Sequence, residues 1–186
     1  MKYTVNDIIK RYNTEKHLKY VFFWGHTVPA WQTWEVTKTC LSQWYDCRFQ
    51  SDGITYYTAE QYMMAQKALL FQDTEIYDEI MTAGHPKQFK ELGRKIRHFD
   101  EKIWNEHKYE IVVRGNLAKF SQNQQLRDFL LGTNTRILVE ASPCDRIWGI
   151  GMSAEDKNIE NPAYWKGENL LGFALMEVRD SLLELK

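Results

Sequence analysis

Glu60 and Lys67 are the residues whose types and spacing first suggest chemistry, and both lie in the segment DGITYYTAEQYMMAQKALLF. If this segment is helical, seven residues are about two turns, so the two side chains project from nearly the same face, about 10 Å apart along the axis. A carboxylate and an amine facing one cleft could act as a catalytic pair. The alternative is that both charges simply point into water.

A second candidate is the loop SPCDRIWGIG at residues 142–151, which follows a strand expected at residues 136–141. Loops at strand ends often carry functional side chains because a rigid scaffold positions them. Asp145 offers a carboxylate, Trp148 a flat face for a base or sugar, and Gly149 a close approach of the backbone to a ligand. The alternative is a tight turn around a core tryptophan.

A third candidate set is basic or amide-bearing. Arg114, Lys119 and Arg48 could form a small cluster that binds one or two phosphates, with Asn116 between the first two. Helix C-termini also favour cations for purely structural reasons, which is the alternative for Lys119. Asn169, before the last expected helix, could cap that helix or bind a ligand, and the cap is the preferred interpretation.

Secondary structure must position these residues. Apolar patterns and turn residues predict strands at residues 20–24, 54–57 and 136–141. Capping-box spacing occurs twice, at Thr58 with Gln61 and at Ser121 with Gln124. Residues 27–52 read as aromatic and irregular. Helices are expected at residues 5–12, 58–71, 74–82, 87–97, 100–114, 126–131 and 171–185. The predicted fold class is therefore mainly α, or α+β with a few short strands.

Composition limits the class of protein. The 186 residues, 44% of them apolar, suit one globular domain over residues 1–186. A net charge of −1 gives no general attraction to nucleic acid or anionic membranes, so any polyanion must bind in a local pocket. No apolar run is long enough to span a bilayer, and the N-terminus lacks the pattern of a secretory signal, so a cytoplasmic location is expected. Three cysteines without a CxxC pair and five scattered histidines predict neither a disulfide framework nor a metal site.

Taken together, the motifs resemble the YbiA-like, or NADAR, family of N-glycosidases. The matching segments span about residues 41–182, and residues 1–20 are less characteristic. Leu41, Gln43 and Asp46 replace the more usual Phe, Asn and Pro of the first motif, whereas Trp44 is retained. The segments run in family order: LSQWYDCRF, DGITYYTAEQYMMAQKALLF, LGRKIRHFD with Trp104, IVVRGNLAKFSQN, LVEASPCDRIWGIG and NLLGFALMEVRDSL.

This resemblance implies a multihelical YbiA-like single domain that hydrolyses the C1–N bond between a (phospho)ribose and a nitrogenous base. Family members act on phosphoribosylated intermediates of riboflavin biosynthesis and release ribose 5-phosphate, and others remove ADP-ribose from guanine bases in nucleic acid. The expected partner is a small phosphoribosyl or ADP-ribosyl substrate, or a single nucleobase in nucleic acid. No metal, organic cofactor, membrane or obligatory protein partner is implied. A non-catalytic module that binds ADP-ribose or a nucleotide remains the alternative from another class.

The chemistry of such a reaction assigns expected roles. Breaking an N-glycosidic bond builds positive charge on C1 and O4′ of the ribose, so carboxylates are needed near the sugar. Glu60 is expected to stabilise that charge or to activate water, and Asp145 to protonate the departing nitrogen or orient the sugar. Trp44 and Trp148 are expected to stack on the base.

Lys67 has two expected roles under the same resemblance. It is either an electrostatic partner of Glu60 or of the phosphate, or a nucleophile that attacks C1 and holds the opened sugar as a Schiff base. The second role requires that burial lowers the pKa of the amine. Glycosylamines open readily to imines, so the covalent role is preferred.

Overall fold

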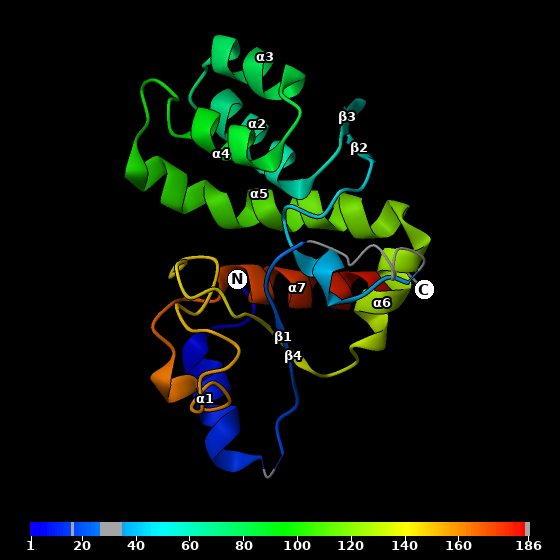
Figure 1. The fold of residues 1–186 in the computed structure, drawn as a ribbon, viewed down its shortest axis with the longest axis vertical. Coiled ribbons are helices and arrows are strands. Elements are labelled where there is room, and N and C mark those ends of the chain that lie inside the picture. The colour runs from blue at the N-terminus through cyan, green and yellow to red at the C-terminus, as the bar shows by residue number, and fades with distance from the viewer. Residues whose placement is uncertain (16, 27–34, 185–186) are drawn as a thin grey trace. The chain divides into compact units, whose positions relative to one another are not determined.

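The computed structural model describes residues 1–15, 17–26 and 35–184. The chain is rich in helices and has a few short strands, which confirms the predicted α+β class (Figure 1). It divides into two compact units. Unit 1 is formed by residues 1–42 and 124–186, and unit 2 by residues 43–123. The assignment of one domain to residues 1–186 stays a prediction.

Unit 2 begins with a short antiparallel hairpin. Strand β2 (Phe49–Ser51) pairs with β3 (Ile54–Tyr56). The two linking residues, Asp52 and Gly53, have φ values of 52° and 77°. Positive φ at both positions is the conformation of a type I′ turn, which matches the twist of a hairpin. The strand predicted at residues 54–57 is confirmed, although it ends one residue early.

The central element of unit 2 is helix α2 (Ala59–Leu70). The side chain of Thr58 accepts a hydrogen bond from the backbone N–H of Gln61 at 3.0 Å, as the capping prediction requires. The Gln61 side chain, however, accepts from the N–H of Tyr57 rather than Thr58, so the predicted capping box is not reciprocal. Every residue from position 59 to position 65 is buried. The helix is therefore enclosed on all sides over its first two turns.

Three further helices pack on α2, as Figure 1 shows: α3 (Thr74–Thr82), α4 (Pro86–Gly93) and α5 (Glu101–Gln122). The contacts are close enough to require glycine. A Cβ on Gly93 would lie 2.1 Å from the sulfur of Met64, and one on Gly115 would lie 2.4 Å from the ring of Tyr62. Helix α3 has the predicted bounds.

Two helix predictions need correction. The helix expected at residues 87–97 ends at Gly93, because the chain leaves the helix to bring Arg97 to the carboxylate of Asp73. Ser121 does not cap a helix, since it lies in the last turn of α5 and its hydroxyl donates to the carbonyl of Ala118. Helix α5 therefore extends beyond its predicted end to Gln122.

Unit 1 has a two-stranded parallel sheet. Strand β1 (Tyr20–Phe23) pairs with β4 (Ile137–Glu140), with Tyr20 opposite Ile137. The last helix, α7 (Leu170–Glu184), packs on β4 so closely that a Cβ on Gly172 would lie 2.1 Å from the carbonyl of Leu138. The other helical elements of unit 1 are α1 (Val5–Thr14), α6 (Gln124–Gly132) and the short 3-10 helices η2 (Lys38–Leu41) and η3 (Pro162–Tyr164).

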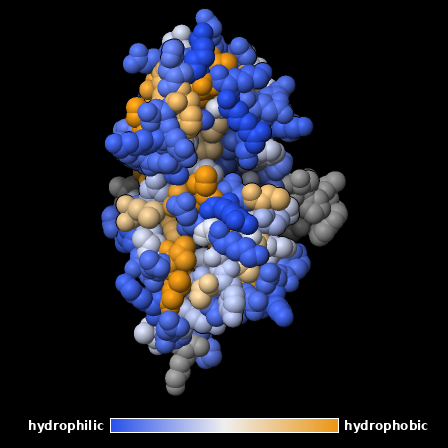
Figure 2. All heavy atoms as spheres, turned by 90° about the vertical axis from the view of Figure 1, so that its left-hand side faces the viewer, coloured by the Kyte–Doolittle hydropathy of each residue, from blue (hydrophilic) through white to orange (hydrophobic). Residues whose placement is uncertain are grey.

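The region expected to be irregular, residues 27–52, is only partly described: residues 27–34 lie outside the described residues. The part from residue 35 onward contains η2 and β2. Within the described residues, no helix is long and apolar enough to cross a membrane. The molecular face drawn in Figure 2 is largely hydrophilic, with apolar side chains in separate patches.

Candidate functional site

Glu60 lies in the first turn of α2 and is 4% exposed. A carboxylate at a helix N-terminus is stabilised by the backbone dipoles, which helps to explain how this acid is kept inside the protein. The backbone N–H of Glu60 donates to the carbonyl of Gln43 at 2.9 Å. Glu60 is therefore a buried acid with a fixed backbone, not a solvated surface charge.

Gln43 and Asn116 form a buried polar connection beside this turn. The Nδ2 of Asn116 donates to the Oε1 of Gln43 at 2.8 Å and to the carbonyl of Val112 at 2.9 Å. The Oδ1 of Asn116 finds no hydrogen-bond partner among the residues that the structure describes, although Asn116 is fully buried. Asn116, predicted to bind substrate, is thus joined through Gln43 to the start of α2. The sequence indicated Gln43 only as a departure from the family motif.

Lys67 occupies a different environment, two turns along the same helix. It is half-buried, and its Nζ donates to the carbonyl of Gly93 at 2.7 Å. The same nitrogen lies 4.3 Å from the ring centroid of Phe99 and 5.4 Å from that of Trp104. Aromatic faces attract a cation, and the carbonyl accepts one of its protons. Sequence reasoning did not identify Gly93 and Phe99 as its neighbours, because they come from a segment about 26 residues away along the chain.

The pKa of Lys67 is lowered from its ordinary value of 10.5, and burial of the amine is the cause. An adjacent carboxylate would oppose this effect by stabilising the ammonium form, and none contributes here. Within the described residues, the environment of Lys67 therefore makes the ammonium form less favourable than it is in a solvated lysine. This distinguishes it from a lysine held in an ion pair with Glu60.

A shallow hollow of about 750 Å³ opens at the start of α5, and Phe99 is one of its walls. Phe99 thus borders both the Lys67 amine and an open surface. Three carboxylates and one lysine line the hollow, so its charge does not suit a phosphate. Its lining residues are Phe99, Asp100, Glu101, Lys102, Asn105 and Glu106.

The three cations predicted to form a phosphate cluster differ in burial. Lys119 is fully buried, with its Nζ 5.5 Å from the ring centroid of Tyr45. Arg48 and Arg114 are exposed. Positions 114 and 119 are five residues apart on α5, which points their side chains to different faces of the helix. These three cations therefore do not form one exposed basic patch, and their joint role in binding a phosphate stays a prediction.

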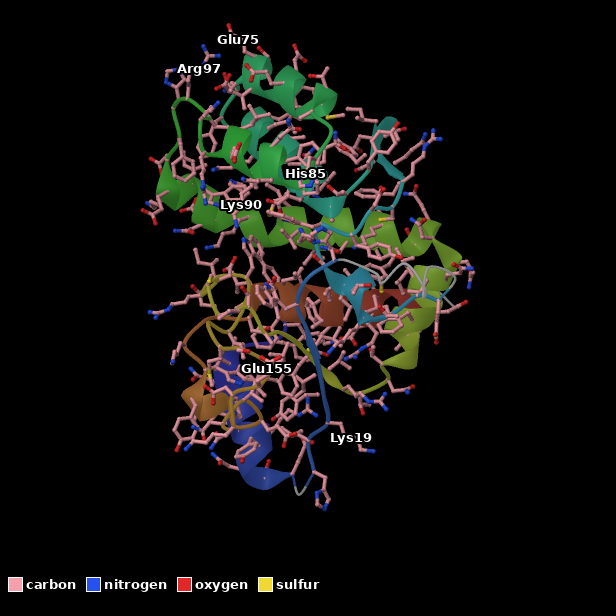
Figure 3. The ribbon with its side chains drawn as sticks, viewed as in Figure 1. Lys19, Glu75, His85, Lys90, Arg97 and Glu155 are labelled. Carbon is pink, nitrogen blue, oxygen red and sulfur yellow. The ribbon has the colours of Figure 1, made fainter. Side chains whose placement is uncertain are left out.

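Trp44 and Cys47 belong to the same segment of unit 2. The ring of Trp44 meets that of His85 edge-on at 6.5 Å, and His85 in turn accepts from the N–H of Lys87 at the start of α4 (Figure 3). Trp44 is only half-buried, so part of the indole remains open for stacking. Burial raises the pKa of the Cys47 thiol, and the charge of Lys119 partly offsets this effect.

In unit 1, Asp145 organises the loop that follows β4. Its Oδ1 accepts the backbone N–H groups of Ile147 at 2.9 Å and Trp148 at 2.8 Å. Side-chain bonds of aspartate to the backbone two or three residues on are typical of tight turns. Asp145 and Trp148 are each half-buried, so both retain an accessible part. The alternative interpretation of this loop as a tight turn therefore explains the hydrogen bonds of Oδ1 of Asp145, but assigns no role to Oδ2.

Gly149 and Asn169 are tied into the same loop. A Cβ on Gly149 would lie 2.8 Å from the carbonyl of Glu140, so packing alone accounts for this glycine. Asn169 is fully buried with a φ of 55°, and its amide bonds to the backbone of β4 at Glu140 and Leu138. Its side chain does not cap α7, contrary to the preferred interpretation. Its Oδ1 and Nδ2 are instead hydrogen-bonded to the backbone of β4.

The structure thus brings Glu60 and Asn116 near a common buried partner, Gln43. Lys67 lies apart from them in an environment of its own. The other predicted residues of unit 1, Asp145, Trp148, Gly149 and Asn169, belong to a single loop and the start of its following helix. No group of three or more metal-binding side chains occurs within the described part of the chain. All three cysteines are free thiols.

Comparison with known proteins gives consistent relationships. The NADAR domain pattern matches residues 22–183. An N-glycosidase of Acanthamoeba polyphaga mimivirus is 42% identical over 167 residues, which cover 87% of this chain and 95% of the relative. The N-glycosidase YbiA of Escherichia coli is 34% identical over 131 residues, or 70% of this chain and 73% of the relative. The solution structure of E. coli YbiA has a TM-score of 0.71 and 28% identity, and covers 89% of this chain and 86% of that one.

Proposed function

Because the chain belongs to the NADAR family, we propose that it is an N-glycosidase, a hydrolase that cleaves the C1–N bond between a (phospho)ribose and a nitrogenous base. Its relatives from a giant virus and from E. coli carry the name N-glycosidase. We further propose that the substrate is a small phosphoribosyl compound of the kind formed early in riboflavin biosynthesis, and that the sugar product is ribose 5-phosphate.

The single observation that carries the mechanism is the half-buried position of the Lys67 amine, against the carbonyl of Gly93 and the ring of Phe99. Burial lowers its pKa, and no carboxylate among the described residues counteracts that effect. A neutral amine is a nucleophile, whereas an ammonium ion is not. This observation favours the covalent role of Lys67 over an ion pair with Glu60.

In the proposed reaction, the ribosylamine ring opens to an imine at C1, and the proton needed by the ring oxygen comes from an acid. The Lys67 amine adds to C1, and its proton passes to the nitrogen of the base. The C1–N bond to the base then breaks, which leaves a Schiff base between Lys67 and the sugar. Water adds to C1, the C1–Nζ bond breaks, and the aldehyde sugar and the free amine are released.

Glu60 is the proposed carboxylate for the proton transfers or for stabilising positive charge near C1. Its burial supports the proposal, because electrostatic interactions are stronger away from water. Asp145 remains the proposed second carboxylate, with its Oδ2 as the group that would act, since Oδ1 accepts two backbone bonds. Trp44 and Trp148 remain the proposed stacking residues.

The proposal is tested by incubating the full chain separately with a phosphoribosylaminouracil, an ADP-ribosylated guanine oligonucleotide and NAD, and measuring release of ribose 5-phosphate or ADP-ribose. We expect turnover of the phosphoribosylaminouracil, and at least a 100-fold loss of rate in Glu60→Gln and in Lys67→Met. Lys90→Met, which removes an exposed lysine of α4, is the matched control (Figure 3).

Each outcome separates the hypotheses. Release of ADP-ribose only from the guanine oligonucleotide would replace the proposed substrate by the ADP-ribosyl one. Binding of ADP-ribose without turnover of any compound would favour the non-catalytic module. Borohydride added during turnover should attach the sugar to Lys67, as detected by mass spectrometry, and an active enzyme without this adduct would contradict the Schiff base.

A further inference from the structure

The carboxylate of Asp73, in unit 2, accepts four hydrogen bonds. Its side chain has no exposed surface, and its Oδ2 accepts the backbone N–H of Arg97 at 2.9 Å and the Nε at 3.1 Å. Its Oδ1 accepts from the Nη2 of Arg97 at 2.6 Å and from the N–H of Ile76 at the start of α3. A two-pronged bond of this kind fixes direction as well as distance. The carboxylate therefore holds both the backbone and the side chain of Arg97.

Each partner of this ion pair is tied to the surroundings of Lys67. The N–H of Asp73 donates to the carbonyl of Ala68, the residue after Lys67, at 2.9 Å. Arg97 lies in the segment 93–99, whose first residue provides the carbonyl bonded to the Lys67 amine and whose last residue provides the nearest ring. The pair thus joins the end of α2 to a segment that supplies two of the groups around the amine, the carbonyl of Gly93 and the ring of Phe99.

The segment 93–99 is also held at its two ends by packing. Gly93 rests against Met64 of α2, and the ring of Phe99 meets that of Phe71 edge-on at 5.3 Å. Between them, His98 has a φ of 57°, a left-handed conformation that a residue with a side chain adopts at an energetic cost. The neighbouring Arg97 tethers the middle of the segment through its bonds to Asp73, and the buried side chain of Ile96 anchors the same stretch.

We propose that Asp73 and Arg97 are positioning residues for Lys67: their ion pair keeps the carbonyl of Gly93 and the ring of Phe99 against the Lys67 amine and keeps water away from it. This inference rests on the proposed function for its catalytic meaning. Figure 3 shows Arg97 beside Glu75, whose carboxylate approaches the same guanidinium at 3.1 Å. The Glu75 side chain is exposed, so water competes for this contact and we expect it to contribute little to the position of Arg97.

The first measurement does not depend on activity. Limiting acetic anhydride modifies neutral amines, so the pH dependence of Lys67 acetylation, followed by mass spectrometry on the full chain, reports its titration. In Asp73→Asn and Arg97→Gln we expect the midpoint to rise toward the ordinary value of 10.5, because the amine becomes hydrated. Asp73→Asn also alters the residue that caps α3, whereas Arg97→Gln leaves that cap in place. The two variants together therefore separate loss of the ion pair from loss of the cap.

Two controls separate positioning from general loss of stability. Glu75→Gln removes the exposed carboxylate from the same guanidinium, and Ile80→Val makes a modest cavity in the buried face of α3. Both should retain the wild-type titration of Lys67. Far-ultraviolet circular dichroism and thermal unfolding establish that each variant is folded at the assay temperature.

The second measurement uses ribose 5-phosphate and cyanoborohydride as the probe. The aldehyde and the Lys67 amine form an imine with loss of water, and hydride reduces it to a stable secondary amine. A raised midpoint leaves less neutral amine at any pH below that midpoint, so we expect less adduct in Asp73→Asn and in Arg97→Gln than in the wild-type chain at the same pH.

The outcomes distinguish this inference from the proposed function. An unchanged Lys67 titration in folded Arg97→Gln would overturn the positioning role, whatever the activity. A shifted titration without any wild-type adduct would uphold positioning of the amine and overturn the Schiff-base step. A shift of equal size in Ile80→Val would also overturn the inference, because it would trace the effect to stability.

Discussion

The amine of Lys67 is the residue-scale feature from which the mechanism follows. Its neighbours are one carbonyl, from Gly93, and two aromatic rings, from Phe99 and Trp104. These groups accept or attract protons of the ammonium form, yet burial outweighs them and lowers the pKa. The same helix places Glu60 in a buried position near Gln43. One helix therefore carries an acid and an amine in two distinct environments.

The lowered pKa of Lys67 makes a prediction about pH. A base with a lowered pKa is neutral over a wider range of pH. The yield of borohydride-trapped sugar should therefore rise with pH, pass through a midpoint below 10.5 and then level off. The measurement is the yield of adduct on Lys67 as a function of pH, in buffers of constant ionic strength. A midpoint at or above 10.5 would contradict the assigned environment of the amine.

At the scale of elements, α2 is held by close approaches of neighbouring helices. Gly115 of α5 faces the ring of Tyr62, and Gly93 of α4 faces Met64. These contacts fix α2 between two helices and so fix the direction of both Glu60 and Lys67. The glycine at each crossing is required by space and not by a special backbone angle, since neither has a positive φ.

Gly115→Ala should therefore destabilise the protein by about 1–3 kcal/mol, because the new methyl group would lie 2.4 Å from the Tyr62 ring. Gly132→Ala is the matched control: nothing lies within 4 Å of its Cβ position at the end of α6, and the change should stabilise by about 0.5 kcal/mol. Urea denaturation measures both. Equal effects of the two substitutions would show that the α2–α5 contact is not tight.

At the scale of the whole molecule, the net charge of −1 argues for a substrate recognised locally. Non-specific binding to nucleic acid depends on many phosphate contacts with clustered basic residues. Arg48 and Arg114 are exposed but Lys119 is buried, so these predicted phosphate ligands do not form a surface track.

Unmodified DNA should consequently bind weakly, with a Kd above about 10 µM at physiological salt. Fluorescence anisotropy with a labelled single-stranded oligonucleotide measures this. The same oligonucleotide with an ADP-ribosylated guanine tests whether a single modified base is recognised independently of the strand. Tight, salt-dependent binding of the unmodified strand would contradict the prediction.

Local sequence signals determined much of this protein. The Thr58 cap and the period of apolar residues depend on near neighbours, so strand β3 and most helices could be predicted, whereas β2 lies in a region that was expected to be irregular. The motifs also determined the family, because they extend over most of the chain. The prediction of a cap at Ser121 was wrong, because a serine followed three residues later by a glutamine can also occur within a helix that continues past the serine.

Tertiary structure alone decided which charges are buried and what surrounds them. Spacing placed Glu60 and Lys67 on one face but could not tell a buried pair from a solvated one, since burial depends on helices distant in sequence. The bond of Lys67 to Gly93 spans 26 residues, and Asp73 reaches Arg97 across 24. No local pattern encodes such contacts, because they exist only after α3, α4 and α5 have packed on α2.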